Sequence, residues 1–95
     1  MKRDEALAIL TAHWEELAAF GLRRLALFGS VARDEAGPDS DVDVLVEFEG
    51  DPTFKRYAGL YDCLEDVLPC PVDLVTADSL RLPIRETVEK DILYV

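Results

Sequence analysis

The sequence has few of the residues that would place it outside a reducing compartment or inside a membrane. It contains only two cysteines, Cys63 and Cys70, without the C-x₂-C spacing of a zinc site or the density of a secreted disulfide framework. It also has no N-terminal apolar leader and no run of about 18 apolar residues. We therefore expect a cytoplasmic protein with no membrane contact and two thiols without redox function.

Basic residues are scarce as well. Ten Lys and Arg stand against 20 Asp and Glu, which gives a formal net charge of −10. This charge repels phosphate backbones, so we expect no direct binding to nucleic acid, whereas a basic protein surface would suit it as a partner. Asn and Gln are absent and Arg exceeds Lys by seven to three. That bias fits a heat-exposed source, and a genome of skewed composition explains it equally well.

The remaining composition is that of one globular unit. Of the 95 residues, 49% are apolar, and neither repeats nor linkers interrupt them, so we expect a single domain over residues 1–95. Hydrophobic periodicity predicts helices over 4–20, 54–68 and 82–95, and strands over 22–29, 41–48 and 71–77. The helix over 54–68 should pack through Phe54, Tyr57 and Tyr61 and expose Lys55 and Arg56. The predicted fold class is α/β (α+β), a small mixed β-sheet with helices packed on it.

Acidic side chains begin two of the predicted strands. Asp41 and Asp43 open the strand over 41–48, and Asp73 opens the strand over 71–77. Because a helix connects these strands, we expect them to be parallel, with their first residues side by side. Residues two apart in a strand point to one face, roughly 6.6 Å apart. Carboxylates at that spacing can converge on two Mg²⁺ ions about 3.5 to 4 Å apart, as in phosphoryl and nucleotidyl transfer.

An Asp-x-Asp pair alone is more often an acidic strand end exposed to solvent. The stretch before it favours a site, because Gly29 and Ser30 fall between a strand and a short helix, where backbone N–H groups can hold phosphate. The sequence excludes two other uses of these residues. An EF-hand starting at Asp39 would need Gly and Glu where Val44 and Gly50 stand, and no Gly-Lys-Ser/Thr follows Gly29 to make a Walker P-loop.

Three motifs resemble a known family. "GSVAR" at 29–33, "SDVDVLVEF" at 40–48 and "VDLV" at 72–75 resemble the signature of the DNA polymerase beta-like nucleotidyltransferases, and the short chain is similar to their minimal branch. One position departs from the pattern. Many relatives have Gly after the Arg of the first motif, where this chain has Asp34, so we expect a differently shaped turn before residue 40.

The resemblance implies an Mg²⁺-dependent adenylyltransferase with a palm-like fold that moves AMP from ATP to a hydroxyl and releases pyrophosphate. It implies metal binding and catalysis by Asp41, Asp43 and Asp73, with two ions during turnover. Nucleotide binding would fall to four residues: Gly29, Ser30, Arg33 and Ser40. Arg33 is as readily interpreted as a surface residue paired with Asp34 or Glu35.

The family also suggests a partner. Minimal members often pair with a HEPN-domain toxin and act as its antitoxin, in some cases by adenylylating it. Two alternatives remain at this point. The chain is either a binding module that neutralises a partner without turnover, or a nucleotidyltransferase for a small molecule, which homo-oligomerisation would favour by completing the pocket.

Overall fold

The fold is built on a four-stranded sheet with the strand order β3-β2-β1-β4. The computed structural model describes residues 1–37, 40–51, 53–77 and 92–95. The strands are β1 (Leu22–Phe28), β2 (Val42–Phe48), β3 (Val72–Thr76) and β4 (Leu93–Tyr94). β1 pairs antiparallel with both β2 and β4, whereas β2 and β3 are parallel. The predicted mixed sheet and its parallel pair are both confirmed.

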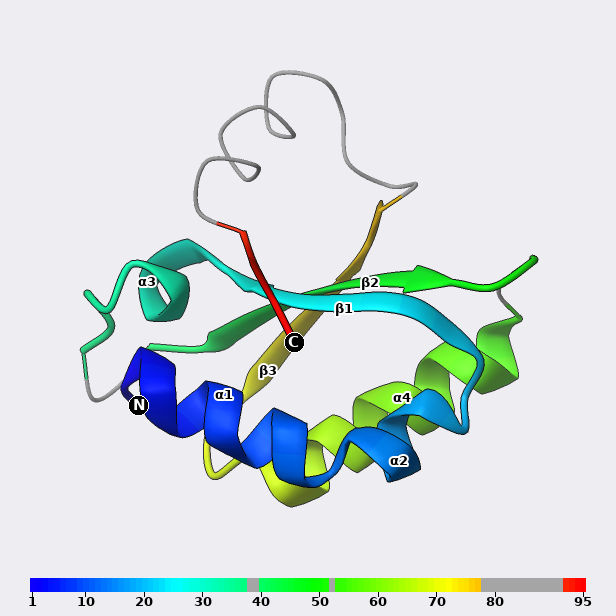
Figure 1. Cartoon of the computed structure of the whole chain (residues 1–95), viewed down its shortest axis with the longest axis horizontal. Helices are drawn as coiled ribbons and strands as arrows, with labels where there is room; N and C mark the ends of the chain where they lie inside the picture. Colours follow the sequence, from blue (N-terminus) through cyan, green and yellow to red (C-terminus); the bar gives the residue numbers. More distant parts are fainter. Residues whose placement is uncertain (38–39, 52, 78–91) are drawn as a thin grey trace.

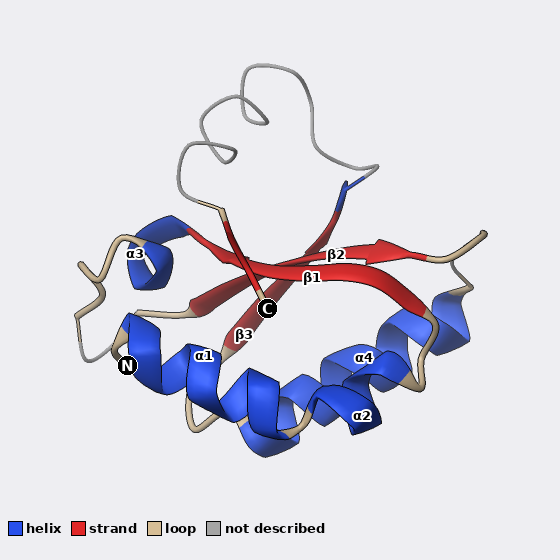
Figure 2. Cartoon of the chain, in the orientation of Figure 1, coloured by secondary structure: helices blue, strands red, loops and turns tan. Residues whose placement is uncertain are grey.

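Three helices cover one face of this sheet (Figures 1 and 2). They are α1 (Arg3–Ala12), α2 (Trp14–Ala18) and α4 (Phe54–Val67), and the short α3 (Gly29–Ala32) follows β1 at one end of the sheet. The alternation of β2 explains the packing, because Val42, Val44 and Val46 are all fully buried in the core beneath these helices. The other face of β2 therefore carries Asp43 and Glu47, which stay half-buried.

Three details differ from the sequence-based expectations. The helix predicted over 4–20 is broken at His13, where ψ is 15°, and the fully buried Leu10 and Leu17 lie on either side of the break. Phe54 is 85% exposed rather than packed, because it is the first residue of α4 and lies beyond the core.

The helix predicted over 82–95 is the third difference. Leu93 and Tyr94 form a strand against β1 instead, which pairs backbone groups at an edge of β1 that β2 leaves open. The rest of that predicted helix, residues 82–91, lies outside the described residues. Within the described ranges, no helix is both long enough and apolar enough to cross a bilayer.

Arg56 binds four backbone carbonyls and links three segments of the chain. Its Nε donates to Phe20 O at 2.9 Å, its Nη1 to Asp51 O at 3.0 Å, and its Nη2 to Gly21 O at 2.6 Å and Glu49 O at 3.0 Å. Its guanidinium also lies 5.1 Å from the ring centroid of Phe48. The expectation that Arg56 is an exposed residue was wrong, since it joins the α2–β1 turn and the end of β2 to α4.

We predict that Arg56→Ala lowers the free energy of unfolding by about 2–4 kcal/mol, because it removes a charged donor from several carbonyls at once. Arg56→Lys should recover less than half of this loss, since an ammonium group cannot reproduce the planar fork. Urea denaturation measures both, and Lys55→Ala, at the exposed neighbouring position, serves as the control. An Arg56→Ala protein within about 0.5 kcal/mol of wild type would contradict this role.

Candidate active site

The carboxylates of Asp43 and Asp73 lie beside each other on neighbouring strands. The parallel register of β2 and β3 pairs Asp43 directly with Asp73, and a bond of 2.9 Å from Val42 N to Pro71 O fixes the start of the pairing. Asp41 lies two residues before Asp43 and is exposed. The structure therefore brings the first residues of the two strands together, as the helical crossover predicts.

This arrangement raises the pKa of Asp43. Partial burial is the largest cause, followed by the negative charges of Asp73 and Asp41 and a hydrogen bond with the Asp73 carboxyl, while the Arg33 guanidinium acts in the opposite direction. A proton or a cation at this position relieves the repulsion between the carboxylates. The fold thus holds together acidic groups that favour a positive ligand.

Gly29 packs directly against the Asp43 carboxylate. Its φ of +71° lies in the left-handed region, and a Cβ at this position would stand only 3.1 Å from Cγ of Asp43 and closer still to Oδ2. Only glycine meets both constraints. The Gly29-Ser30 turn, at the start of α3, therefore lies directly beside Asp43 of the Asp-x-Asp motif.

The turn after α3 has the usual glycine-type shape even though Asp34 occupies it. Asp34 has a φ of +59°, its N–H donates to Val31 O at 3.0 Å, and Glu35 N donates to Ser30 O at 2.8 Å, which together form a Schellman motif. Asp tolerates this conformation better than most residues. The expected difference in shape is therefore absent at this turn.

The side chain of Asp34 has a second function that the sequence did not reveal. Its Oδ1 accepts a hydrogen bond of 3.1 Å from the backbone N–H of Arg3, in the first turn of α1, where Lys2 provides no side-chain cap. The carboxylate therefore satisfies a free N–H of a helix more than thirty residues earlier in the chain. A glycine could not make this bond, which gives a physical reason for an acidic residue at the turn.

The two other proposed nucleotide-binding residues already have protein partners. Arg33 Nε lies 3.1 Å from Glu35 Oε2, in an exposed ion pair, and its charge also acts on Asp43. Ser40 Oγ accepts a hydrogen bond of 3.0 Å from Gly37 N, and so closes the end of the loop before β2. Both interpretations of Arg33 therefore fit its position, and the Ser40 hydroxyl has a structural role whether or not it contacts phosphate.

The site offers magnesium an incomplete set of ligands. Asp43 and Asp73 supply adjacent hard oxygens, and Asp41 lies next to them, but across the described residues no group of three His, Cys, Asp or Glu side chains is arranged to hold a metal ion by itself. Magnesium commonly binds through one or two carboxylates and completes its shell with water and substrate phosphates. The residues fit a metal that arrives with a triphosphate.

Tyr57 forms a hydrogen bond to the strand that carries Asp73. Its hydroxyl donates a 2.6 Å hydrogen bond to the carbonyl of Leu74, the residue after Asp73 on β3. Tyr57 and Tyr61 pack against the core as predicted.

Burial raises the pKa of the Cys63 thiol, with smaller contributions from Glu16 and Asp66, which disfavours the reactive thiolate.

Comparison with known proteins identifies the family of this chain. The family model described as "Nucleotidyltransferase domain" matches residues 10–95. The protein adenylyltransferase MntA of Thermococcus cleftensis is 45% identical over 93 residues, which is 97% of this chain and 94% of that protein. A solved minimal nucleotidyltransferase structure superposes with a TM-score of 0.84 at 38% identity and covers 98% of this chain and 95% of its own. The chain belongs to the nucleotidyltransferase family, in its minimal branch.

A more distant likeness concerns the fold alone. A chain from the solved complex of a tri-AMPylated Shewanella oneidensis HEPN toxin with an MNT antitoxin matches with a TM-score of 0.68 at 20% identity. The match covers 94% of this chain and 70% of that chain.

The family model and the 45% identical relative establish the class: this protein is a nucleotidyltransferase.

We predict that Asp43→Asn raises the melting temperature at pH 7, without added metal, by a few degrees. A carboxyl whose pKa is raised by folding destabilises the folded state once it ionises, so the penalty is present above the folded-state pKa and absent below the unfolded value of 3.8. The gain should therefore shrink as the pH falls toward 3.8. Thermal unfolding at several pH values measures it.

Asp41→Asn is the matched control for this prediction. Asp41 lies on the same side of the chain two residues earlier, but it is exposed. Its substitution should change the melting temperature less than that of Asp43 does. Equal effects of the two substitutions, or a loss of stability in Asp43→Asn at pH 7, would contradict the repulsion described above.

Proposed function

We propose that this chain is an Mg²⁺-dependent protein adenylyltransferase that transfers AMP from ATP to a hydroxyl group of a HEPN-domain toxin, and so acts as its antitoxin. The observation that carries the proposal is the pairing of Asp43 with Asp73 beside the Gly29-Ser30 turn. The 45% identity to a protein adenylyltransferase supports the choice of AMP. We take residues 1–95 to be one catalytic domain.

The proposed reaction is a single displacement at phosphorus. The acceptor oxygen attacks the α-phosphorus of ATP, the bond from that phosphorus to the bridging oxygen of the β-phosphate breaks, and pyrophosphate leaves. Asp73, the exposed member of the pair, accepts the hydroxyl proton. Asp43 is more buried and Gly29 covers it, so we assign it to charge stabilisation rather than proton transfer.

The remaining groups would hold the triphosphate. Backbone N–H groups at Gly29 and Ser30, at the start of α3, would donate to the phosphates, and the Ser30 hydroxyl would add a donor. Arg33, already close enough to act on Asp43, would contact phosphate after exchanging its ion pair with Glu35. Asp41, Asp43 and Asp73 would hold magnesium, which neutralises phosphate charge and lowers the barrier to attack when it is bound.

The partner assignment rests on charge and on a structural relative. The net charge of −10 suits a basic protein surface and disfavours RNA as the acceptor. A chain of the same fold comes from a complex in which the HEPN toxin carries AMP. A protein hydroxyl is therefore a better acceptor candidate than an RNA end.

The test is transfer of label from α-³²P-ATP to a HEPN-domain protein co-purified with this chain, with Mg²⁺ and with EDTA. We expect labelling in Mg²⁺ only, reduced at least about a hundredfold by Asp43→Asn or Asp73→Asn. Asp62→Asn, an exposed acid on α4, should leave it unchanged. Equal labelling by wild type and Asp43→Asn would show that the assigned carboxylates are wrong.

The same experiment separates the two other functions. A tight complex with no label in either protein, unaffected by Asp43→Asn, would identify a binding module that neutralises its partner without turnover. Pyrophosphate release that requires a small hydroxylated compound, with no label on protein, would identify a small-molecule nucleotidyltransferase.

A further inference from the structure

The face of the sheet opposite the helices carries an aromatic side chain on the same side as the carboxylates. Strand register pairs Phe28 with Asp43 and Asp43 with Asp73, so these residues form a row across three strands. Ala26, two residues from Phe28 on β1, pairs with Tyr94 of β4. Because side chains two apart in a strand share a face, Tyr94 lies on the same face as the acidic pair.

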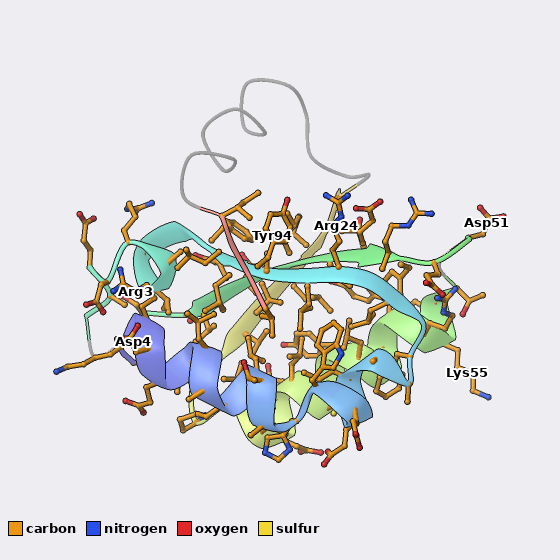
Figure 3. The ribbon with its side chains drawn as sticks, in the orientation of Figure 1. Arg3, Asp4, Arg24, Asp51, Lys55 and Tyr94 are labelled. Atoms are coloured by element: carbon orange, nitrogen blue, oxygen red, sulfur yellow. The ribbon has the colours of Figure 1, made fainter. Side chains whose placement is uncertain are left out.

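Tyr94 presents its ring to solvent beside an arginine. The residue is 58% exposed, and the Arg24 guanidinium lies 5.8 Å from its ring centroid. Figure 3 shows both side chains rising from β1 and β4 on the side away from the helices. The Glu47 carboxylate forms ion pairs with both neighbouring arginines, at 3.4 Å from Arg23 Nη1 and 3.8 Å from Arg24 Nε.

A hollow lies against this ring. It has a volume of about 290 Å³ and is lined by Tyr94 and Arg24 together with Arg23, Trp14, Leu25 and Val95. Trp14 and Leu25 reach this hollow from the helix side, so it lies at the β1–β4 edge of the sheet. On the carboxylate face, the Tyr94 ring with the Arg24 guanidinium beside it is suited to a flat, electron-rich ligand, which stacks on the ring and attracts the cation.

The spacing between Tyr94 and Asp43 fits a nucleotide. Two residues along β1 and two strand spacings separate them on the sheet, which amounts to roughly 12 Å. An extended nucleoside triphosphate covers such a distance between its phosphates and its base. A triphosphate held at Gly29 and the acidic pair could therefore place its base over the sheet at Tyr94.

We propose that Tyr94, with Arg24 beside it, is the stacking platform for the purine base of the nucleotide substrate. This inference rests on the proposed function, since the carboxylates must hold the triphosphate for the base to reach the ring. Tyr94 binds the base and takes no part in the chemistry. Its effect should therefore fall on nucleotide affinity and not on the phosphate chain.

Calorimetry with two ligands, with Mg²⁺ present throughout, tests whether Tyr94 binds the base and not the phosphate chain. The ligands are the α,β-methylene analogue of ATP and inorganic tripolyphosphate, which has the phosphate chain but no base. Tyr94→Leu keeps an apolar side chain in β4 and removes the aromatic ring, and we expect it to weaken the analogue about tenfold and leave tripolyphosphate within about twofold. Tyr94→Phe should restore wild-type affinity.

Phe54→Ala is the matched control, because Phe54 is the other large apolar side chain that is strongly exposed in the described part of the chain. It should change neither affinity. Asp43→Asn should weaken both ligands together. Thermal unfolding confirms that the variants are folded, and Arg24→Ala provides a second variant that leaves β4 intact and should weaken only the analogue.

The outcomes distinguish the inference from the proposed function. If wild type binds both ligands and Tyr94→Leu affects neither, or weakens both equally, the stacking platform is wrong and the proposed function stands. If wild type binds neither ligand with Mg²⁺, the proposed function fails and the platform fails with it.

Discussion

The structure depends on the parallel pairing of β2 with β3, which holds Asp43 against Asp73. Two carboxylates on directly paired residues repel each other, and the partial burial of Asp43 adds to the free-energy cost of ionising it. The valines on the opposite side of β2 offset it, because Val42, Val44 and Val46 are fully buried beneath the helices. One strand therefore contributes its valines to the core on one face and Asp43 to the acidic site on the other.

Polar contacts around α4 keep this pairing in place. Arg56 fastens the first turns of the helix to the end of β2, and Tyr57 bonds the edge of β3 next to Asp73. At the other end of β2, Asp34 joins the turn after α3 to the start of α1. Both α4 contacts come from the start of the helix, which is thereby joined to the two strands that carry the carboxylates. A rigid support of this kind suits a site that must remain assembled before its cation and triphosphate arrive.

Local patterns in the sequence were sufficient for much of this arrangement. Alternation in 41–48 placed the valines and the aspartates on opposite faces, and the helix between two strands predicted that Asp73 would lie beside Asp43. The contacts of Arg56 and the strand position of Tyr94 could not be predicted in this way. Arg56 binds carbonyls as far as 36 residues away, and Tyr94 forms a strand only because β1 offers an open edge. Phe54 has the spacing of the apolar face of α4, but it is the first residue of that helix and lies beyond the end of the core.

Asp34 illustrates a different limit. Its place in the motif suggested a changed turn, whereas the left-handed conformation is retained and the carboxylate gains a helix N–H as its partner. Knowledge of turn chemistry could have predicted the conformation, because Asp is tolerated there. The contact with Arg3 required the packing of α1 beside α3, which no local pattern contains.

The central claim is that the fold places two carboxylates where they share a positive ligand. Carboxyl ¹³C NMR titration of Asp43 tests it most directly, in wild type and in Asp73→Asn, with and without Mg²⁺ and the methylene analogue of ATP. The account predicts a pKa above the ordinary value of 3.8 in the free protein, lowered both by Asp73→Asn and by the metal with the nucleotide. An Asp43 that titrates normally and responds to neither change would contradict it.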